Sequence, residues 1–264
     1  MESATPHHGV VWHIEYLSHI LNALSAVAQF ALKNTNARFR DHGDARRRSI
    51  VSIFPIMAGK TFLFALAFPV TCAVVGRHEA WSGALVSRSQ LCAQTLIATY
   101  LFDMTYRRVN AILWVHHMLS IGVCVFFMTI TTPDAPDIGR LWLAVPMTLL
   151  GMGVGLTDLG GDVAVLLYYL APQTVASARG IRMCVSYLIV GRASAWFIVL
   201  SGLFRGEWRQ LELDTRAVGL ITAVLLCWGF AELEEIYAIL GMSKKLRVKA
   251  EALAVAEEAR PAKS

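Results

Sequence analysis

Charged residues and paired cysteines are scarce in this sequence. Only 16% of its 264 residues are charged, whereas an ordinary globular domain has about 25%. The five cysteines are dispersed and no two of them form a CxxC pair, so neither a disulfide framework nor a zinc site is expected. The first residues read MESATPHHG and lack a basic n-region, so no secretory signal peptide is expected.

Long apolar runs are abundant instead. Hydrophobic residues make up 56% of the sequence and the mean hydropathy is +0.52. A helix needs about 20 mainly apolar residues to cross the hydrocarbon core of a bilayer. Six segments meet this need, and they are 50–76, 86–106, 109–131, 140–170, 183–204 and 217–241. We therefore predict an all-α, polytopic membrane helical bundle.

Two of the apolar segments are less regular. Residues 10–32 are interrupted by His13, Glu15 and His19, so they form either a seventh, N-terminal span or a helix in the membrane interface. Segment 140–170 contains GMGVGLTDLGGD, and we interpret it as one tilted span that glycine loosens near one end.

Every second connection between the apolar segments is rich in lysine and arginine, and the connections between them have few. Fourteen lie near 33–49, 107–108, 171–182 and 244–249, and six lie near the other connections. Cytoplasmic loops of membrane proteins carry the excess of Lys and Arg, so the first set and the C-terminus are expected to be cytosolic. Because these charges flank apolar spans, nucleic-acid binding is not expected.

Three regions follow from this pattern. Residues 1–49 hold the weak span and a basic cytosolic loop, residues 50–241 form the membrane domain, and residues 242–264 form a polar cytosolic tail with a short helix.

Ionisable side chains from several spans fall at a similar depth on the cytosolic half. An ionised group in hydrocarbon costs at least a few kcal/mol, so such groups normally face the bundle interior or a wet cavity. We therefore expect one polar chamber that opens to the cytosol. The groups concerned are Lys60, Asp103, His116, His117, Asp158, Asp162, Arg192, Glu232, Glu234 and Glu235.

Each of these groups also has a structural interpretation. Glu234 and Glu235 could anchor the end of a span, Lys60 could form a structural ion pair, and Asp158 could bind backbone freed by the glycines. Asp103 could pair with the arginines that follow it. Two adjacent histidines at membrane depth, with carboxylates on neighbouring spans, favour a functional role.

The histidine pair is suited to proton transfer. Neighbouring helical residues point about 100° apart, so His116 and His117 are not expected to share one target. A neutral imidazole is a competent base near pH 7, and a carboxylate on its other nitrogen fixes the tautomer. Asp103 and the i,i+4 pair Asp158 and Asp162 are the available carboxylates. The set could deprotonate an amine or hydroxyl, or carry an acyl group on imidazole.

A metal site is not expected. Zinc hydrolases use three His or carboxylate ligands, and the remaining histidines lie at the N-terminus or in predicted loops.

The stretch YLFDMTYRRVNAILWVHHMLSI, residues 100–121, resembles the core of the TLC-domain family, which includes the ceramide synthases. The shared pattern is a span ending in Asp, a short basic turn, and a span with His-His followed by a small polar residue, Ser120. The segment GLTDLGGDVAVLLYYL resembles the later acidic part of the pattern. The likeness covers about residues 50–241.

The resemblance implies a six-helix barrel that lies in the endoplasmic reticulum membrane and opens to the cytosol. It implies that His116, His117 and the acidic residues transfer an acyl group from acyl-CoA to a lipid. The turn before His116 is shorter than in a ceramide synthase, and the smaller family members resemble regulators of lipid composition. The residues expected to bind substrate are Lys60, Tyr106, Asn110, Ser120, Arg192 and Glu232.

Two functions are therefore expected as alternatives. The first is an acyl-CoA-dependent lipid acyltransferase with no bound cofactor and with acyl-CoA as co-substrate. The second is a non-catalytic lipid-binding regulator of membrane lipid composition. Both have a lipid and the bilayer as partners, with a homodimer as an option. Many transporters are built from inverted repeats. The sequence shows no internal repeat, so a transporter is not expected.

Overall fold

The computed structural model describes residues 7–76, 83–107, 109–130, 157–204 and 215–258. These residues are almost entirely helical and contain no strand, which confirms the all-α prediction. The helices are α1 (His7–Thr35), α2 (Ala37–Arg40), α3 (Asp44–Gly76), α4 (Gly83–Tyr106), α5 (Ala111–Ile130), α7 (Asp158–Leu170), α8 (Val175–Phe204) and α9 (Thr215–Glu258).

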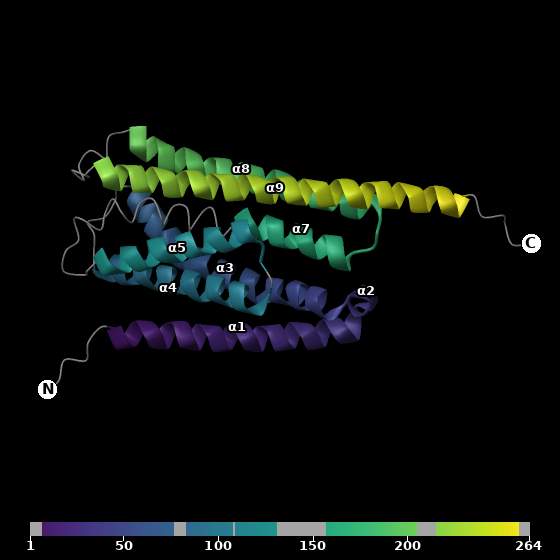
Figure 1. The fold of residues 1–264 in the computed structure, drawn as a ribbon, viewed down its shortest axis with the longest axis horizontal. Helices are drawn as coiled ribbons and strands as arrows, with labels where there is room; N and C mark the ends of the chain where they lie inside the picture. Colours follow the sequence, from purple (N-terminus) through teal and green to yellow (C-terminus); the bar gives the residue numbers. More distant parts are fainter. Residues whose placement is uncertain (1–6, 77–82, 108, 131–156, 205–214, 259–264) are drawn as a thin grey trace, which may run out of the picture.

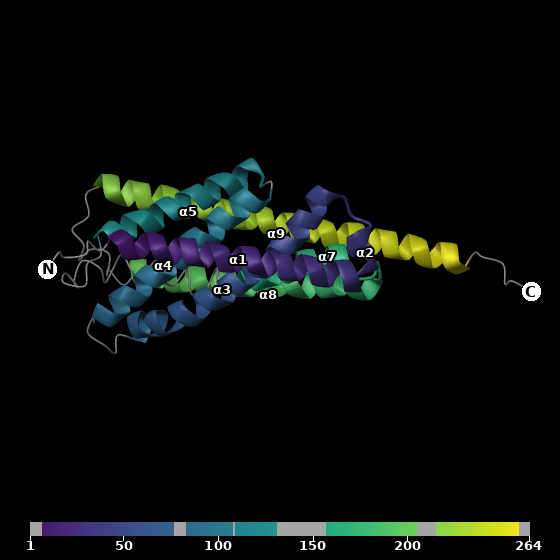
Figure 2. The same ribbon diagram turned by 90° about the horizontal axis from the view of Figure 1, so that it is seen from below.

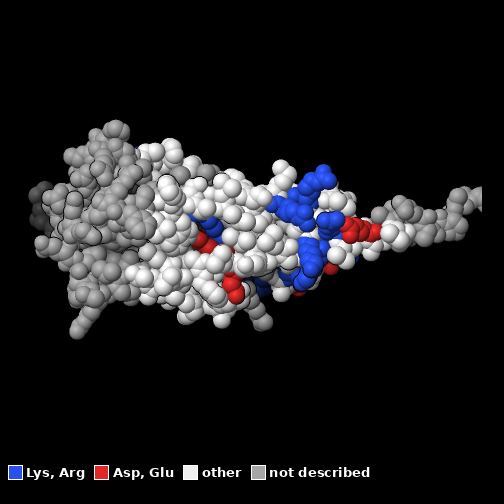
Figure 3. Space-filling model, turned by 90° about the horizontal axis from the view of Figure 1, so that it is seen from above, with Lys and Arg blue, Asp and Glu red and all other residues white. Residues whose placement is uncertain are grey.

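The long helices lie side by side along one axis and alternate in direction (Figures 1 and 2). The turns from α1 to α3, from α4 to α5 and from α7 to α8 therefore lie toward the same end of the bundle as the C-terminal half of α9. These are the four segments in which the sequence concentrates its basic residues. Figure 3 shows Lys and Arg gathered toward this end, while most of the remaining described surface in that view is uncharged.

Two described helices are long and apolar enough to cross a membrane. The qualifying stretches are Asp44–Cys72 of α3 and Ala111–Thr129 of α5, each with a mean hydropathy of 1.9. Only 22% of the α5 stretch is buried in the protein, so most of its apolar side chains face outward. The count of six or seven spans stays a prediction.

Two predicted boundaries differ from the helices observed. Helix α9 continues without a break from Thr215 to Glu258, so the predicted boundary between 241 and 242 falls inside one helix. Helix α8 begins at Val175, eight residues before the predicted span at 183. Arg179 and Arg182 make the start of α8 less apolar than the predicted span, so the helix begins before that span.

Two hydrophobic clusters hold the bundle together. One joins α3, α4, α5 and α9 through residues that include Leu63, Leu96 and Phe127. The other joins α7, α8 and α9 through residues that include Ile181 and Leu188. Helix α9 contributes to both clusters, so it connects the two halves.

The glycines of α7 allow close helix packing. A Cβ atom on Gly160 would lie 2.9 Å from Cδ1 of Tyr187 and 3.0 Å from the backbone oxygen of Cys184, both on α8. Gly160 and Gly161 are buried in a regular helix, so the predicted loosening is wrong at these two positions. Residues 140–156 of that predicted span lie outside the described residues.

Replacing Gly160 by alanine should therefore destabilise the protein. The new methyl group meets a backbone oxygen that cannot swing aside, and such overpacking costs about 1–3 kcal/mol. Gly122 of α5 is the matched control, because a Cβ there meets nothing within 4 Å and alanine favours helix by up to about 1 kcal/mol. Thermal unfolding in one detergent should show a lower Tm for Gly160→Ala and an equal or higher Tm for Gly122→Ala. Equal Tm changes would contradict the close packing.

Candidate functional site

A cavity of about 260 Å³ lies inside the bundle, and residues from α3, α4, α5, α7, α8 and α9 line it. It brings together nine of the eleven residues predicted to form the site. These nine are Lys60, Asp103, Asn110, His116, His117, Asp158, Asp162, Arg192 and Glu232. We call this cavity the chamber.

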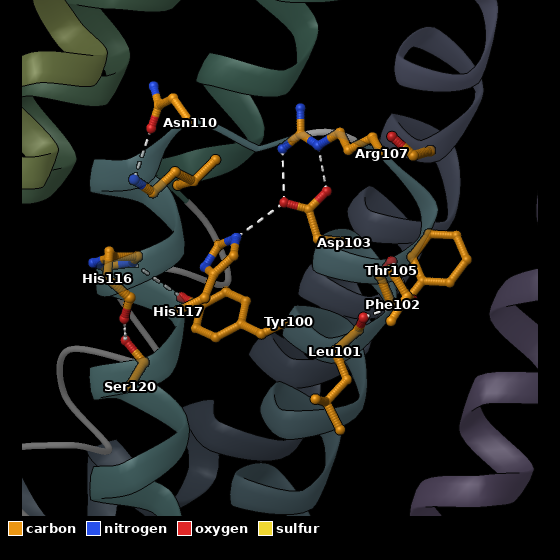
Figure 4. Close-up of polar contacts among 12 residues, drawn as sticks. Tyr100, Leu101, Phe102, Asp103, Thr105, Arg107, Asn110, His116, His117 and Ser120 are labelled. Atoms are coloured by element: carbon orange, nitrogen blue, oxygen red, sulfur yellow. Dashed lines mark hydrogen bonds and ion pairs between the residues drawn. The ribbon is translucent and has the colours of Figure 1, made fainter. Parts of the chain in front are cut away.

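The tight connection between α4 and α5 places Asp103 opposite His117. The Asn110 side chain accepts a hydrogen bond from the backbone N–H of Leu113 at 2.7 Å, which caps the start of α5. His117 then lies in the second turn of α5, and its Nε2 is 2.9 Å from Oδ2 of Asp103 (Figure 4). Both residues are buried, with 4% and 3% exposure respectively.

Arg107 completes this arrangement. Its Nε donates to Oδ1 of Asp103, and its Nη2 donates to Oδ2 at 2.8 Å, so the guanidinium grips both carboxylate oxygens. A carboxylate that accepts two such bonds is ionised, and its bond with His117 therefore uses a proton on Nε2. The Nδ1 atom of His117 is buried and has no hydrogen-bond partner among the described residues. In the neutral imidazole, that nitrogen carries the free lone pair.

His116 has a different environment. The indole N–H of Trp228 donates to its Nε2 at 3.2 Å, and the Tyr100 hydroxyl lies 3.5 Å from the same atom. His116 Nε2 is therefore an acceptor that is already occupied. The Tyr100 ring also stacks on His117, with ring centroids 4.2 Å apart, and this contact fixes the plane of that imidazole.

An ionic network forms the opposite wall of the chamber. Lys60 of α3 donates to Asp162 at 2.8 Å and lies 3.7 Å from Asp158, both on α7. Arg192 of α8 donates to Asp158 at 2.8 Å and also to Glu235 of α9. The i,i+4 spacing of the two aspartates puts both on one face of α7, as predicted, but they pair with cations and not with the histidines.

Acidic groups outnumber basic ones in the chamber. Among the described residues that line it, the cations are Lys60, Arg107 and Arg192, and the carboxylates are Asp103, Asp158, Asp162, Glu232, Glu234 and Glu235. One Glu232 oxygen accepts from the indole N–H of Trp196 at 2.8 Å, which is a neutral partner. The surplus of carboxylates favours a cationic group, or bound protons, in the chamber.

Two predicted substrate-binding residues lie elsewhere. Tyr106 stacks on Phe102 and lines a separate polar pocket beside α1 and α3. Ser120 does not line the chamber, and its hydroxyl donates to the backbone oxygen of His116 at 2.8 Å. Asn110 does line the chamber, although its side-chain oxygen caps α5.

The aromatic partners of the histidines, Tyr100 and Trp228, were not among the predicted site residues. Tyr100 lies three residues before Asp103, on the same face of α4, and Trp228 lies four residues before Glu232, on the same face of α9. Both positions share a helical face with a residue already identified. Helical spacing from the known acidic residues could therefore have found them.

Searches against protein-family models, curated proteins and solved structures find no match to this chain. Among the described residues, no group of three His, Cys, Asp or Glu side chains is arranged to hold a metal ion.

Breaking the ion pair of Lys60 should cost more stability than breaking an exposed ion pair. Lys60→Met leaves the half-buried Asp162 without its cation, while Asp158 keeps Arg192, and breaking a buried pair costs about 3–5 kcal/mol. The double variant Lys60→Met/Asp162→Asn removes the unpaired charge and should recover part of the loss, which a double-mutant cycle measures as coupling. Thermal unfolding gives the three values.

Asp44→Asn is the control for this cycle, because Asp44 pairs with Arg47 but its side chain is 89% exposed. Exposed pairs contribute about 0–1 kcal/mol, so the control should change little. Strictly additive effects of Lys60→Met and Asp162→Asn would contradict the network.

Proposed function

We propose that this chain is a multi-pass membrane protein with a TLC-type helical barrel whose basic end faces the cytosol. Support comes from the two apolar helices, from the outward-facing apolar side chains of α5, and from the basic segments that share one end. The charged groups gathered inside the bundle also suit a chain surrounded by lipid, since such groups avoid hydrocarbon by facing inward.

We further propose that the protein is an acyl-CoA-dependent lipid acyltransferase. The observation that carries this proposal is the buried His117–Asp103 pair, whose free Nδ1 belongs to a residue that lines the chamber. A base needs a lone pair, a fixed tautomer and access to its substrate. Asp103 fixes the tautomer and Tyr100 fixes the plane of the ring, and a substrate would approach Nδ1 from the chamber that His117 lines.

In the proposed reaction, Nδ1 of His117 takes the proton from a lipid amine or hydroxyl as that group attacks the thioester carbonyl of acyl-CoA. The carbon–sulfur bond then breaks, and the departing thiolate takes the same proton back from the imidazolium. The products are an acylated lipid and free CoA. Asp103 stabilises the imidazolium between the two steps, and Arg107 keeps Asp103 ionised and in place.

The acidic surplus of the chamber favours a lipid whose polar head is cationic. A protonated amine would offset the carboxylates that Lys60 and Arg192 leave uncompensated. It would give one proton to a carboxylate of the network before its neutral form attacks, and His117 would take the second proton during the attack. The predicted residues therefore have two different roles. The His117–Asp103 pair moves the proton, and the network of Asp158, Asp162 and Glu232 attracts the head group.

Removal of the base should abolish acyl transfer. General-base catalysis contributes about 10²–10⁴-fold, so His117→Ala should lower the turnover rate by at least 10²-fold, and Asp103→Asn should lower it through loss of the correct tautomer. The assay uses purified protein in nanodiscs, acyl-CoA and a total membrane lipid extract, with mass spectrometry of the acylated products.

The control is His42→Ala, because His42 contacts the backbone oxygen of Tyr169 and does not line the chamber. Unchanged product formation in His117→Ala would remove the proposal. A lipid of one class bound by the wild-type protein, without turnover, would favour the non-catalytic regulator in its place.

The proposed orientation has its own test. An N-glycosylation acceptor appended after Ser264 should stay unmodified in microsomes, while one inserted between residues 77 and 82 should be modified, because only lumenal acceptors are glycosylated. Modification of the C-terminal acceptor would overturn the orientation but not the chemistry.

A further inference from the structure

A second cavity adjoins the chamber. It has a volume of about 450 Å³ and lies between α5 and α9, within the range of about 300–1,000 Å³ that is usual for small-molecule sites. We call it the α5–α9 groove. Four residues line both cavities, namely Ile112, His116, Trp228 and Ala231. The groove and the chamber therefore share a wall, and the hydrogen-bonded His116 and Trp228 are part of it.

The floor of the groove is one stripe of α5. Ala111, Val115, Leu119 and Val123 follow at intervals of four residues, so they lie on one helical face. At 1.5 Å per residue, this stripe extends about 18 Å. Among the described lining residues, the other side chains are apolar except His116, Ser120 and Cys227.

The polar groups of the groove are already engaged or weakly polar. The Ser120 hydroxyl is used by the His116 backbone, Nε2 of His116 accepts from Trp228, and a thiol behaves as a small hydrophobe. An occupant that fits such a lining is a hydrocarbon chain and not a polar molecule.

The groove also opens to the outside of the bundle. Two of its α9 lining residues are strongly exposed, Leu226 at 70% and Phe230 at 58%, and Val115 on α5 is 49% exposed. Its other side is the wall shared with the chamber. A membrane amphiphile could therefore enter from the side, while acyl-CoA would arrive from the basic, aqueous end.

We infer that the α5–α9 groove binds the alkyl chain of the lipid acceptor whose polar head occupies the chamber. The inference rests on the proposed function for the identity of the head group, but the groove itself is defined by α5 and α9 alone. His116 and Trp228 sit where chain and head meet, so His116 contributes to the wall while His117 acts as the base. Val123, at the far end of the stripe, sets the length of chain that fits.

The direct test is photo-crosslinking. The probe is a long-chain primary alkyl amine with a diazirine on its chain, incubated with the full-length protein in nanodiscs. Peptide mass spectrometry should place the adducts on residues 111–123 of α5 and 226–231 of α9. Adducts confined to other helices would overturn the inference.

Chain length gives the second test. Val123→Trp should block the end of the groove and lower the affinity for the longest chains about tenfold, which corresponds to the loss of roughly two buried methylenes. Affinity is measured by competition of alkyl amines of graded length against the probe. Val115→Trp is a second blocking variant, since its exposed position tolerates a larger side chain.

The matched control is Val125→Trp. Val125 is on the same helix and is 45% exposed, but it lines neither cavity, so the length profile should not change. A profile for Val123→Trp and Val115→Trp equal to that of the control would overturn the inference.

The groove and the proposed function fail in different ways. Adducts in the groove without any acyl transfer would refute the transferase and leave the groove intact. Acyl transfer that depends on His117 but places no adduct in the groove would refute the groove alone.

Discussion

The ionic network around Lys60 and Arg192 constrains how the helices of this protein can pack. The two cations reach from α3 and α8 to carboxylates on α7 and α9, so four helices are joined by charges that are largely withdrawn from water. Moving any of these helices would separate a largely buried charge from its partner, which costs about 3–5 kcal/mol. The network therefore fixes the position of the wall that faces the histidines.

The charges of the chamber are divided into two groups with different consequences. Asp103 is matched in charge by Arg107, and the Nδ1 atom of His117 has no hydrogen-bond partner among the described residues. Across the chamber, the carboxylates outnumber Lys60 and Arg192. The His117–Asp103 pair thus shares one cavity with an acidic network. In the proposed function, the network would attract a cationic head group and the pair would move a proton.

The sequence predicts only those contacts of the site that join residues close together in the chain. Asp103 and His117 could be paired because a short basic turn joins their helices, and Asp158 and Asp162 could be placed on one face because they are four residues apart. The partner of Lys60 could not be predicted, since it depends on which helices become neighbours. Ser120 was expected to bind substrate because of the family resemblance, but it lies four residues after His116, on the part of α5 that lines the cavity beside α9. The helices themselves followed from hydropathy, whereas their ends did not, because α8 and α9 extend into polar sequence.

The same angular argument explains why two histidines occupy one apolar helix. Successive residues of α5 point about 100° apart, so one imidazole faces Asp103 while its neighbour faces Trp228 on α9. His117 keeps a nitrogen without a hydrogen-bond partner among the described residues, and Nε2 of His116 accepts a hydrogen bond from the indole of Trp228. A single histidine could be a base or part of the wall, but not both. The pair lets one turn of α5 line the polar chamber with one imidazole and bound the apolar groove with the other. This is the arrangement that the proposed binding of an amphiphile, with one polar and one hydrocarbon end, would use.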